Sequence, residues 1–168
     1  AMIASASSLF SQAVPATQGV RALRAQASLL LGCDAVMPAA PTGRTALAYR
    51  PLANRIGATF ESLGTSAWRW PEGRLTYENA LPAQALIAAG RYLDPSPLLE
   101  AGLDVLDWLI ASQTDPSGHL SPVGNGWWPR GGEKSKFDQQ PIEATALVLA
   151  AESAYEATGD DKYHAAME

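Results

Sequence analysis

Three apolar segments recur along the chain at nearly constant spacing. Residues 23–32, 81–90 and 142–151 share an Ala/Leu-rich pattern, with successive offsets of about 58 and about 61 residues. Ala and Leu favour helices, and each segment is apolar nearly all the way round, which a helix tolerates only when both of its sides are covered. We therefore predict that these segments are inner helices.

Amphipathic segments lie between the apolar ones. After Ser96, a predicted N-cap, and Pro97, a predicted first helical residue, apolar residues recur on one helical face, at Leu99, Leu103, Leu106 and Ile110. Residues 44–62 show the same pattern. A third outer helix is predicted after residue 159, with Asp160 as its cap and Tyr163 on its inner face. The pattern thus predicts inner and outer helices in alternation.

The connections between these helices also alternate in length. Inner helices are followed by shorter turns, whereas residues 64–76 and 114–139 form long connections. A structureless connection of about 25 residues in a compact domain is usually functional. The sequence predicts an all-α fold over residues 17–168, an antiparallel αα-hairpin array of about three hairpins in which the long loops fall at the same end. Residues 1–16 are expected to be a tag or an irregular segment.

Composition and charge exclude several classes of protein. The 168 residues suffice for one domain, and 12 Lys+Arg against 17 Asp+Glu give a net charge of −5 without a basic cluster, so no nucleic-acid partner is expected. Cys33 is the single cysteine and only two histidines accompany it, so neither a disulfide nor a Cys/His zinc site is expected. The longest apolar stretches run about eight residues, where a membrane helix needs about 20. We expect no cofactor, no metal, no membrane association and a cytoplasmic location.

The two long connections concentrate aromatic and polar residues. They hold four of the five tryptophans, together with carboxylates, amides and arginines. Tryptophan faces stack on the apolar faces of pyranose rings, while polar side chains hydrogen-bond hydroxyl groups. Packing of the same tryptophans under the loops as a satellite core is the alternative. The candidate sugar-binding residues are Trp70, Tyr77, Asn79, Trp127, Trp128, Arg130, Gln139 and Gln140.

Three carboxylates stand at the predicted starts of inner helices. Glu78, Asp138 and Glu143 are candidate catalytic groups, because glycosidic-bond chemistry uses paired carboxylates, one protonated as an acid and one ionised as a base or nucleophile. Structural roles remain open beside this one. Asp138 and Thr76 are placed to cap helices, and Glu78 and Glu143 are placed to favour the positive end of a helix dipole.

Several motifs carry a resemblance to a known superfamily, in residues 77–83, 118–132, 137–144 and 158–163. Through them the chain resembles the (α/α) toroid superfamily, six-hairpin carbohydrate-active enzymes that include glycoside hydrolases and sugar 2-epimerases. More narrowly, it is similar to the helical regions found with bacterial glycosyltransferases. Glu78 stands where those regions have Asp, and Leu81-Pro82-Ala83 replaces their Arg-Leu-Pro. The resemblance implies a partial (α/α) toroid, about half of a six-hairpin ring, and part of a carbohydrate-active enzyme.

Two function hypotheses follow from these observations. The first is a carbohydrate-active domain that binds or processes a glycan at its loop-rich end, with hydrolysis, epimerisation and binding alone all left open. The second is a non-catalytic helical repeat scaffold that mediates protein–protein or interdomain contacts. Because the last hairpin is incomplete, we expect a longer parent protein whose further hairpins cover the open edge. Exposed apolar flanks are costly, so the chain alone is expected to form a homodimer through the sides near residues 29–31 or 147–149.

Overall fold

The fold is predominantly helical, as the sequence predicts. The structure is a computed structural model that describes residues 2–17, 19–38, 43–63, 67–93 and 96–168. Two strands of two residues each accompany the helices. In chain order the elements are α1 (Met2–Ala13), the 3-10 helix η1 (Val14–Thr17), α2 (Leu23–Val36), α3 (Arg44–Glu61), β1 (Arg74–Leu75), α4 (Leu81–Tyr92), α5 (Ser96–Gln113), β2 (Trp128–Pro129), α6 (Pro141–Thr158) and α7 (Asp161–Ala165).

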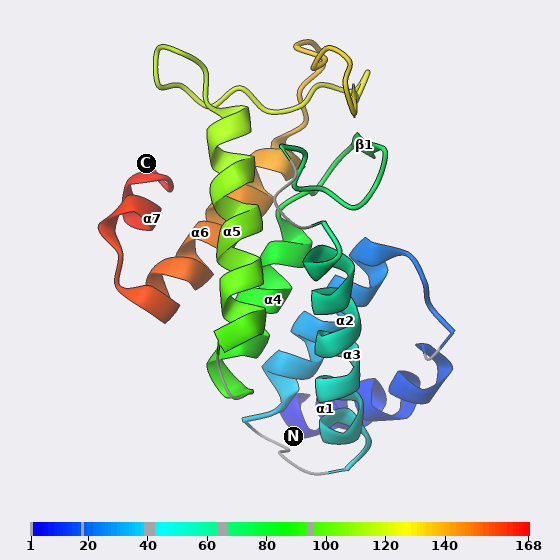
Figure 1. Ribbon diagram of the computed structural model, residues 1–168. Coiled ribbons are helices and arrows are strands. Elements are labelled where there is room, and N and C mark those ends of the chain that lie inside the picture. The colour runs from blue at the N-terminus through cyan, green and yellow to red at the C-terminus, as the bar shows by residue number, and fades with distance from the viewer. Residues whose placement is uncertain (1, 18, 39–42, 64–66, 94–95) are drawn as a thin grey trace.

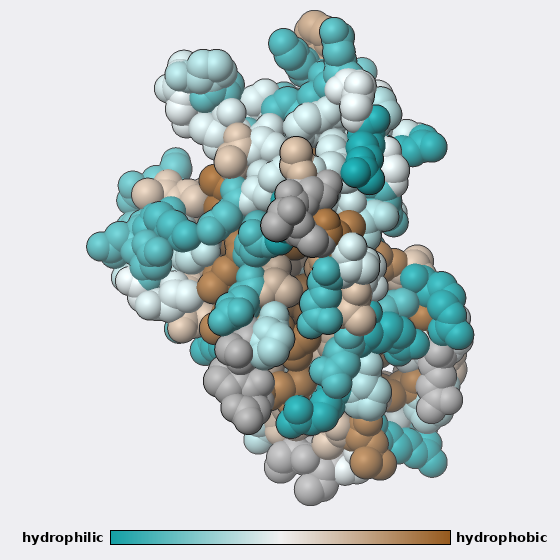
Figure 2. Space-filling view, viewed as in Figure 1, coloured by the Kyte–Doolittle hydropathy of each residue, from teal (hydrophilic) through white to brown (hydrophobic). Residues whose placement is uncertain are grey.

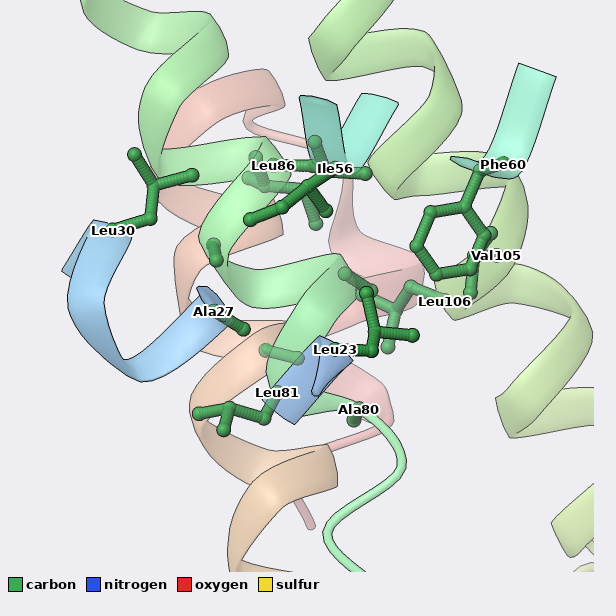
Figure 3. Packing of buried hydrophobic residues seen from close by; sticks show 14 of the residues in the cluster. Leu23, Ala27, Leu30, Ile56, Phe60, Ala80, Leu81, Leu86, Val105 and Leu106 are labelled. Carbon is green, nitrogen blue, oxygen red and sulfur yellow. The ribbon is translucent and has the colours of Figure 1, made fainter. Parts of the chain in front are cut away.

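Helix α4 forms the centre of the molecule. It packs against α2, α5 and α6 (Figure 1), and residues 81–83 and 85–90 are all buried. Figure 3 shows side chains from α2, α3 and α5, such as Leu23, Ile56 and Leu106, gathered around α4. The prediction that the apolar segments are covered on both sides is thus confirmed for α4.

The other two apolar helices are covered less completely than α4. Helix α2 buries one face, through residues such as Ala27 and Leu30, and α6 buries another, through residues such as Leu147 and Ala150. On α6, Val148 is 38% and Leu149 is 41% exposed. The prediction of two-sided cover is therefore wrong for α6, whereas α2 contacts α4 and α3 and has Phe10 of α1 over Gly32.

Two glycines allow α4 and α5 to approach closely. A Cβ added at Gly102 of α5 would lie 3.0 Å from the Ala83 carbonyl oxygen and the Ile87 backbone nitrogen of α4. A Cβ added at Gly90 of α4 would lie 2.8 Å from the Leu99 backbone nitrogen of α5. Side chains at these positions would therefore force the two helices apart.

The predicted start of the last helix is confirmed in atomic detail. The Asp160 side chain accepts a hydrogen bond from the Lys162 backbone N–H at 3.0 Å, and Tyr163 is buried. Gly159 ends α6 in the left-handed conformation, with φ of 68°, which glycine adopts at little cost. Helix α5 begins at Ser96, whose predicted capping side chain lies outside the part of the chain that the structure describes.

Residues 2–17 are helical, where a tag or an irregular segment over residues 1–16 is expected from the sequence. Helix α1 and η1 occupy it. Phe10 of α1 packs over Gly32 of α2, and the Ser11 and Thr45 hydroxyl groups lie 3.0 Å apart. Helix α1 has no fully buried residue, and tertiary contacts such as these stabilise a short helix.

The two long connections lie side by side at one end of the molecule, at the top of Figure 1. Strands β1 and β2 pair antiparallel, with Arg74 opposite Pro129 and Leu75 opposite Trp128. The prediction that both long loops fall at the same end is confirmed, for the residues outside 64–66. Figure 2 shows mostly hydrophilic residues over this loop end. Among the described residues, no helix combines the length and apolar character needed to cross a membrane.

Candidate functional site

A pocket of about 190 Å³ opens at the loop end. It draws residues from both long connections and from the first turn of α6. Four of the predicted site residues line it together, Tyr77, Trp127, Gln140 and Glu143. The remaining lining residues are Thr76, Val123, Gly124 and Asn125.

Glu143 is the buried carboxylate of this pocket, with 1% of its surface exposed. Its Oε1 atom accepts hydrogen bonds from Asn79 Nδ2 at 2.9 Å and from Gln113 Nε2 at 3.1 Å. Its Oε2 atom accepts one from the Asn79 backbone N–H at 3.1 Å. A buried carboxylate needs such donors to replace its lost hydration. Three elements, α6, the end of α5 and the loop before α4, therefore fix the position of Glu143.

Arg24 of α2 extends this network to the third inner helix. Its guanidinium donates to Asn79 Oδ1 at 2.9 Å, to Thr76 Oγ1 at 2.8 Å and to Glu72 Oε2 at 3.1 Å, and its Nε donates to the Tyr77 carbonyl at 2.6 Å. The site prediction missed Arg24. A cation inside an otherwise apolar inner-helix segment was the signal that could have found it.

Gln113 is a further residue that the site prediction missed, as are the lining residues Val123, Gly124 and Asn125. It is fully buried at the end of α5, where its Nε2 donates to Glu143 and its Oε1 accepts from the Val123 backbone N–H at 2.9 Å. It thereby ties the second long loop to the carboxylate. Nothing in the spacing around Gln113 distinguishes it from a solvated residue at a helix end.

Two exposed aromatic side chains form the rim of the pocket. Tyr77 is 50% and Trp127 is 42% exposed. Each has a guanidinium on its ring, Arg24 at 4.9 Å from the Tyr77 centroid and Arg74 at 5.0 Å from the Trp127 centroid. Cation–π contacts of this kind hold aromatic rings in place. The rim thus offers aromatic surface to a ligand.

Three residues near the pocket have left-handed backbone conformations without being glycine. Glu78 has φ of 50°, Trp127 of 65° and Asp138 of 55°. Such conformations cost free energy and cluster at functional sites. Glu78 and Asp138 each stand three residues before an inner helix, α4 and α6. All three belong to the predicted site set, although the sequence gives no sign of their backbone conformation.

The capping alternative for the loop residues is wrong. Helix α4 has Ala80 at its N-cap and α6 has Gln140, and in neither does a side chain make a capping hydrogen bond. The Thr76 hydroxyl instead accepts from Arg24. Glu143 does lie in the first turn of α6, so the favourable position relative to the helix dipole is confirmed for that residue.

Two predicted sugar-binding residues are buried away from the pocket surface. Trp70 is 1% exposed and packs edge-on against Phe60, with ring centroids 6.0 Å apart. Asn79 has no exposed surface, because its side chain lies between Arg24 and Glu143. Neither residue lines the pocket, so the structure does not place Trp70 for stacking or Asn79 for hydroxyl binding there. Asn79 instead positions the carboxylate.

Trp128 belongs to a closed tryptophan cluster. Its ring centroid lies 5.5 Å from that of Trp68 and 6.4 Å from that of Trp108, and its indole N–H donates to the Gly132 carbonyl at 3.0 Å. Lys134 covers the cluster, donating to the Ser112 and Ser121 carbonyls. Burial lowers the pKa of Lys134. For these tryptophans the satellite-core alternative describes the structure.

The other predicted residues lie outside the lining of the pocket. Arg130, Asp138 and Gln139 are exposed and Glu78 is half-buried. Gln139 donates from Nε2 to the Pro122 carbonyl at 3.1 Å. The Asp138 carbonyl accepts from the backbone N–H of Asn125, a pocket residue, at 3.2 Å. Within the described ranges, no group of three His, Cys, Asp or Glu side chains is placed to hold a metal ion.

The geometry defines a class of site, a small pocket with a buried carboxylate floor and an aromatic rim on an all-α scaffold. We found no protein-family model that matches the chain, and neither a curated protein nor a solved structure matches it significantly.

Proposed function

We propose that the chain is a carbohydrate-active domain that binds a glycan in the pocket at its loop end. The observation that carries this proposal is the convergence of Tyr77, Trp127, Gln140 and Glu143 on one pocket. Exposed aromatic rings beside an amide and a carboxylate combine apolar and hydrogen-bonding surface, which is what a sugar ring offers in return.

The helix arrangement supports a (α/α) toroid as the framework of this domain. Helix α4 contacts α2 on one side and α6 on the other, while α3 contacts α5. An inner row of three helices with an outer row beside it is the arrangement expected of successive αα-hairpins.

Binding is tested by titrating intrinsic tryptophan fluorescence with a panel of mono- and oligosaccharides. Trp127 reports on the pocket because it lines it. Tyr77→Ala should weaken the affinity about two- to tenfold, the range expected for loss of one aromatic contact. Tyr92→Ala is the matched control, since Tyr92 is 56% exposed at the opposite end of α4. If none of the sugars changes the fluorescence, the proposal is rejected.

Processing of the glycan would require carboxylates beside the pocket. Glu78 follows the pocket residue Tyr77 directly, and the Asp138 backbone is bonded to the pocket residue Asn125. With Glu143 they are the proposed acid and base groups. Glu78→Gln and Asp138→Asn should abolish turnover of a bound glycan while leaving its affinity within about threefold. Unchanged turnover in both variants would show that Glu78 and Asp138 are not the acid and base groups.

A helical scaffold is the second candidate function. The closed cluster of Trp68, Trp108 and Trp128 favours it, because most loop tryptophans then serve packing. A scaffold predicts that no sugar changes the fluorescence and that the loop end instead binds a neighbouring domain. The panel titration therefore distinguishes the two functions.

A further inference from the structure

The pocket has one charged group in its lining. Of the eight lining residues, Glu143 alone carries a charge, and the others are aromatic, aliphatic, amide, hydroxyl or glycine residues. The adjacent Arg24 donates hydrogen bonds to Glu72, Thr76 and Asn79. The carboxylate of Glu72 therefore balances the charge of Arg24. Glu143 is therefore the charge within the lining itself, whereas the Arg74 guanidinium lies beside it against the Trp127 ring.

The Glu143 carboxylate also has capacity for a further donor. Each carboxylate oxygen accepts about two hydrogen bonds. Oε1 accepts two, from Asn79 and Gln113. Among the described residues, the Asn79 backbone N–H is the single donor to Oε2. A ligand that reaches the floor can satisfy Oε2 only by donating a hydrogen bond.

The size of the pocket limits the ligand. Sites for drug-sized molecules occupy about 300–1,000 Å³, whereas this pocket has about 190 Å³. It has room for one small ring, with any continuing chain outside the rim formed by Tyr77 and Trp127.

We propose that the pocket takes a single sugar ring without negative charge, that an amino sugar is preferred to its neutral counterpart, and that Glu143 sets this preference. The inference rests on the proposed function. An ammonium group donates a charge-assisted hydrogen bond to the carboxylate, a hydroxyl donates a weaker one, and a ligand carboxylate is repelled.

The test is calorimetric titration of the whole chain with three matched sugars, glucosamine, glucose and glucuronic acid, at low salt. We expect glucosamine to bind at least about tenfold more tightly than glucuronic acid, with glucose between them. At about 1 M salt, where the Debye length is about 3 Å, the differences in affinity among the three sugars should become smaller. Glu143→Gln should remove the preference, so that glucosamine, glucose and glucuronic acid bind the variant within about threefold of one another.

Each outcome separates the inference from the proposed function. Binding of all three sugars with equal affinity overturns the inference and leaves glycan binding intact, whereas binding of none overturns both. Tighter binding of glucuronic acid than of glucosamine also overturns the inference. If the Arg74→Gln variant then lacks that preference, the guanidinium beside Trp127 is its source. If Glu143→Gln does not fold, the order of the three affinities in the unmodified chain and its response to salt still decide.

Discussion

At the scale of single residues, Glu143 joins the site to the stability of the fold. Its three donors come from the loop before α4 and from the end of α5, so its carboxylate connects elements that are far apart in the chain. The same bonds that hold it for a ligand also hold the helices together. A change at this position must therefore affect stability as well as binding.

Glu143→Gln should lower the free energy of unfolding by about 1–3 kcal/mol, the cost of leaving buried donors without acceptors. The new amide must direct its NH₂ group at either the Asn79 backbone N–H or the two side-chain donors on Oε1, and both alternatives place donor against donor. Urea unfolding measures the loss. Glu152→Gln is the control, because Glu152 is exposed on the same helix, and we expect it to change stability by less than about 0.5 kcal/mol. Equal effects of the two substitutions would contradict the structural role of Glu143.

Cys33 predicts a pH dependence of stability. Burial, and secondarily the charge of Asp34, raise the pKa of the Cys33 thiol from 9.0 to about 11. The native state thus keeps the proton to higher pH than the unfolded state does. The stabilisation that this difference in the Cys33 pKa gives the native state is complete below pH 9.0, and it is lost as the pH rises towards about 11.

Chemical denaturation across that range should show stability falling with pH by at most about 1.4 kcal/mol per pH unit from this group. Cys33→Ala should remove that part of the slope. Tyr49, whose pKa is raised by burial and by its bond to Asp34, would account for a slope that persists in the variant. A stability that is flat above pH 9.0 in the unmodified chain would contradict the shift of Cys33.

At the scale of secondary-structure elements, helical periodicity carries most of the prediction. The three apolar segments and the amphipathic ones between them all lie in helices of the structure, because a 3.6-residue pattern depends only on nearby positions. The Asp160 cap was predictable because it too involves only nearby residues, a side chain and the backbone N–H two positions on. The 1–16 segment was not, since α1 is held by contacts of Phe10 and Ser11 with residues distant in the chain.

The site was predictable in composition and not in geometry. Aromatic and acidic residues in the loops marked Tyr77, Trp127 and Glu143, which do meet. Whether a loop tryptophan points outward or inward depends on the path of the loop, so Trp70 and Trp127 look alike in sequence and differ in burial. Arg24 stands out as a cation in an apolar segment, but its partners, like those of Gln113, depend on tertiary placement that no local spacing encodes.

The crossing of α4 and α5 gives a prediction about elements. Gly102→Ala should destabilise the chain by about 1–3 kcal/mol, because its Cβ would meet the α4 backbone at Ala83 and Ile87. Alanine's better helix propensity offsets at most about 1 kcal/mol of this. Thermal unfolding provides the measurement. Gly19→Ala is the control, since a Cβ there meets nothing within 4 Å, and it should leave stability unchanged or raise it slightly. A Gly102→Ala variant as stable as the control would show that the helices can separate without cost.

At the scale of the whole molecule, the two edges of the helix array differ. At the α2 edge, α1 brings Phe10 over Gly32, and Leu29 and Leu31 are partly buried. At the α6 edge, Ile142, Val148 and Leu149 remain exposed. The accessible surface of 9053 Å² exceeds the roughly 7,950 Å² expected of a compact monomer of this mass. The total does not locate this surface, but the exposed apolar residues of α6 mark one edge that a partner could cover.

We therefore propose that the chain forms a two-fold homodimer through α6, because a self-complementary apolar patch closes most simply in that way. Light scattering should give a dimer mass, because burying apolar surface contributes about 25 cal/mol per Å². The average mass should fall on dilution, because dimer formation depends on protein concentration. Leu149→Glu should yield a monomer by placing a charge in the contact. Leu47→Glu, at a leucine that is 78% exposed on α3, is the matched control and should leave the dimer intact. A monomer mass for the unmodified chain at every concentration would reject the dimer, and loss of the dimer in Leu47→Glu with retention in Leu149→Glu would move the contact to α3.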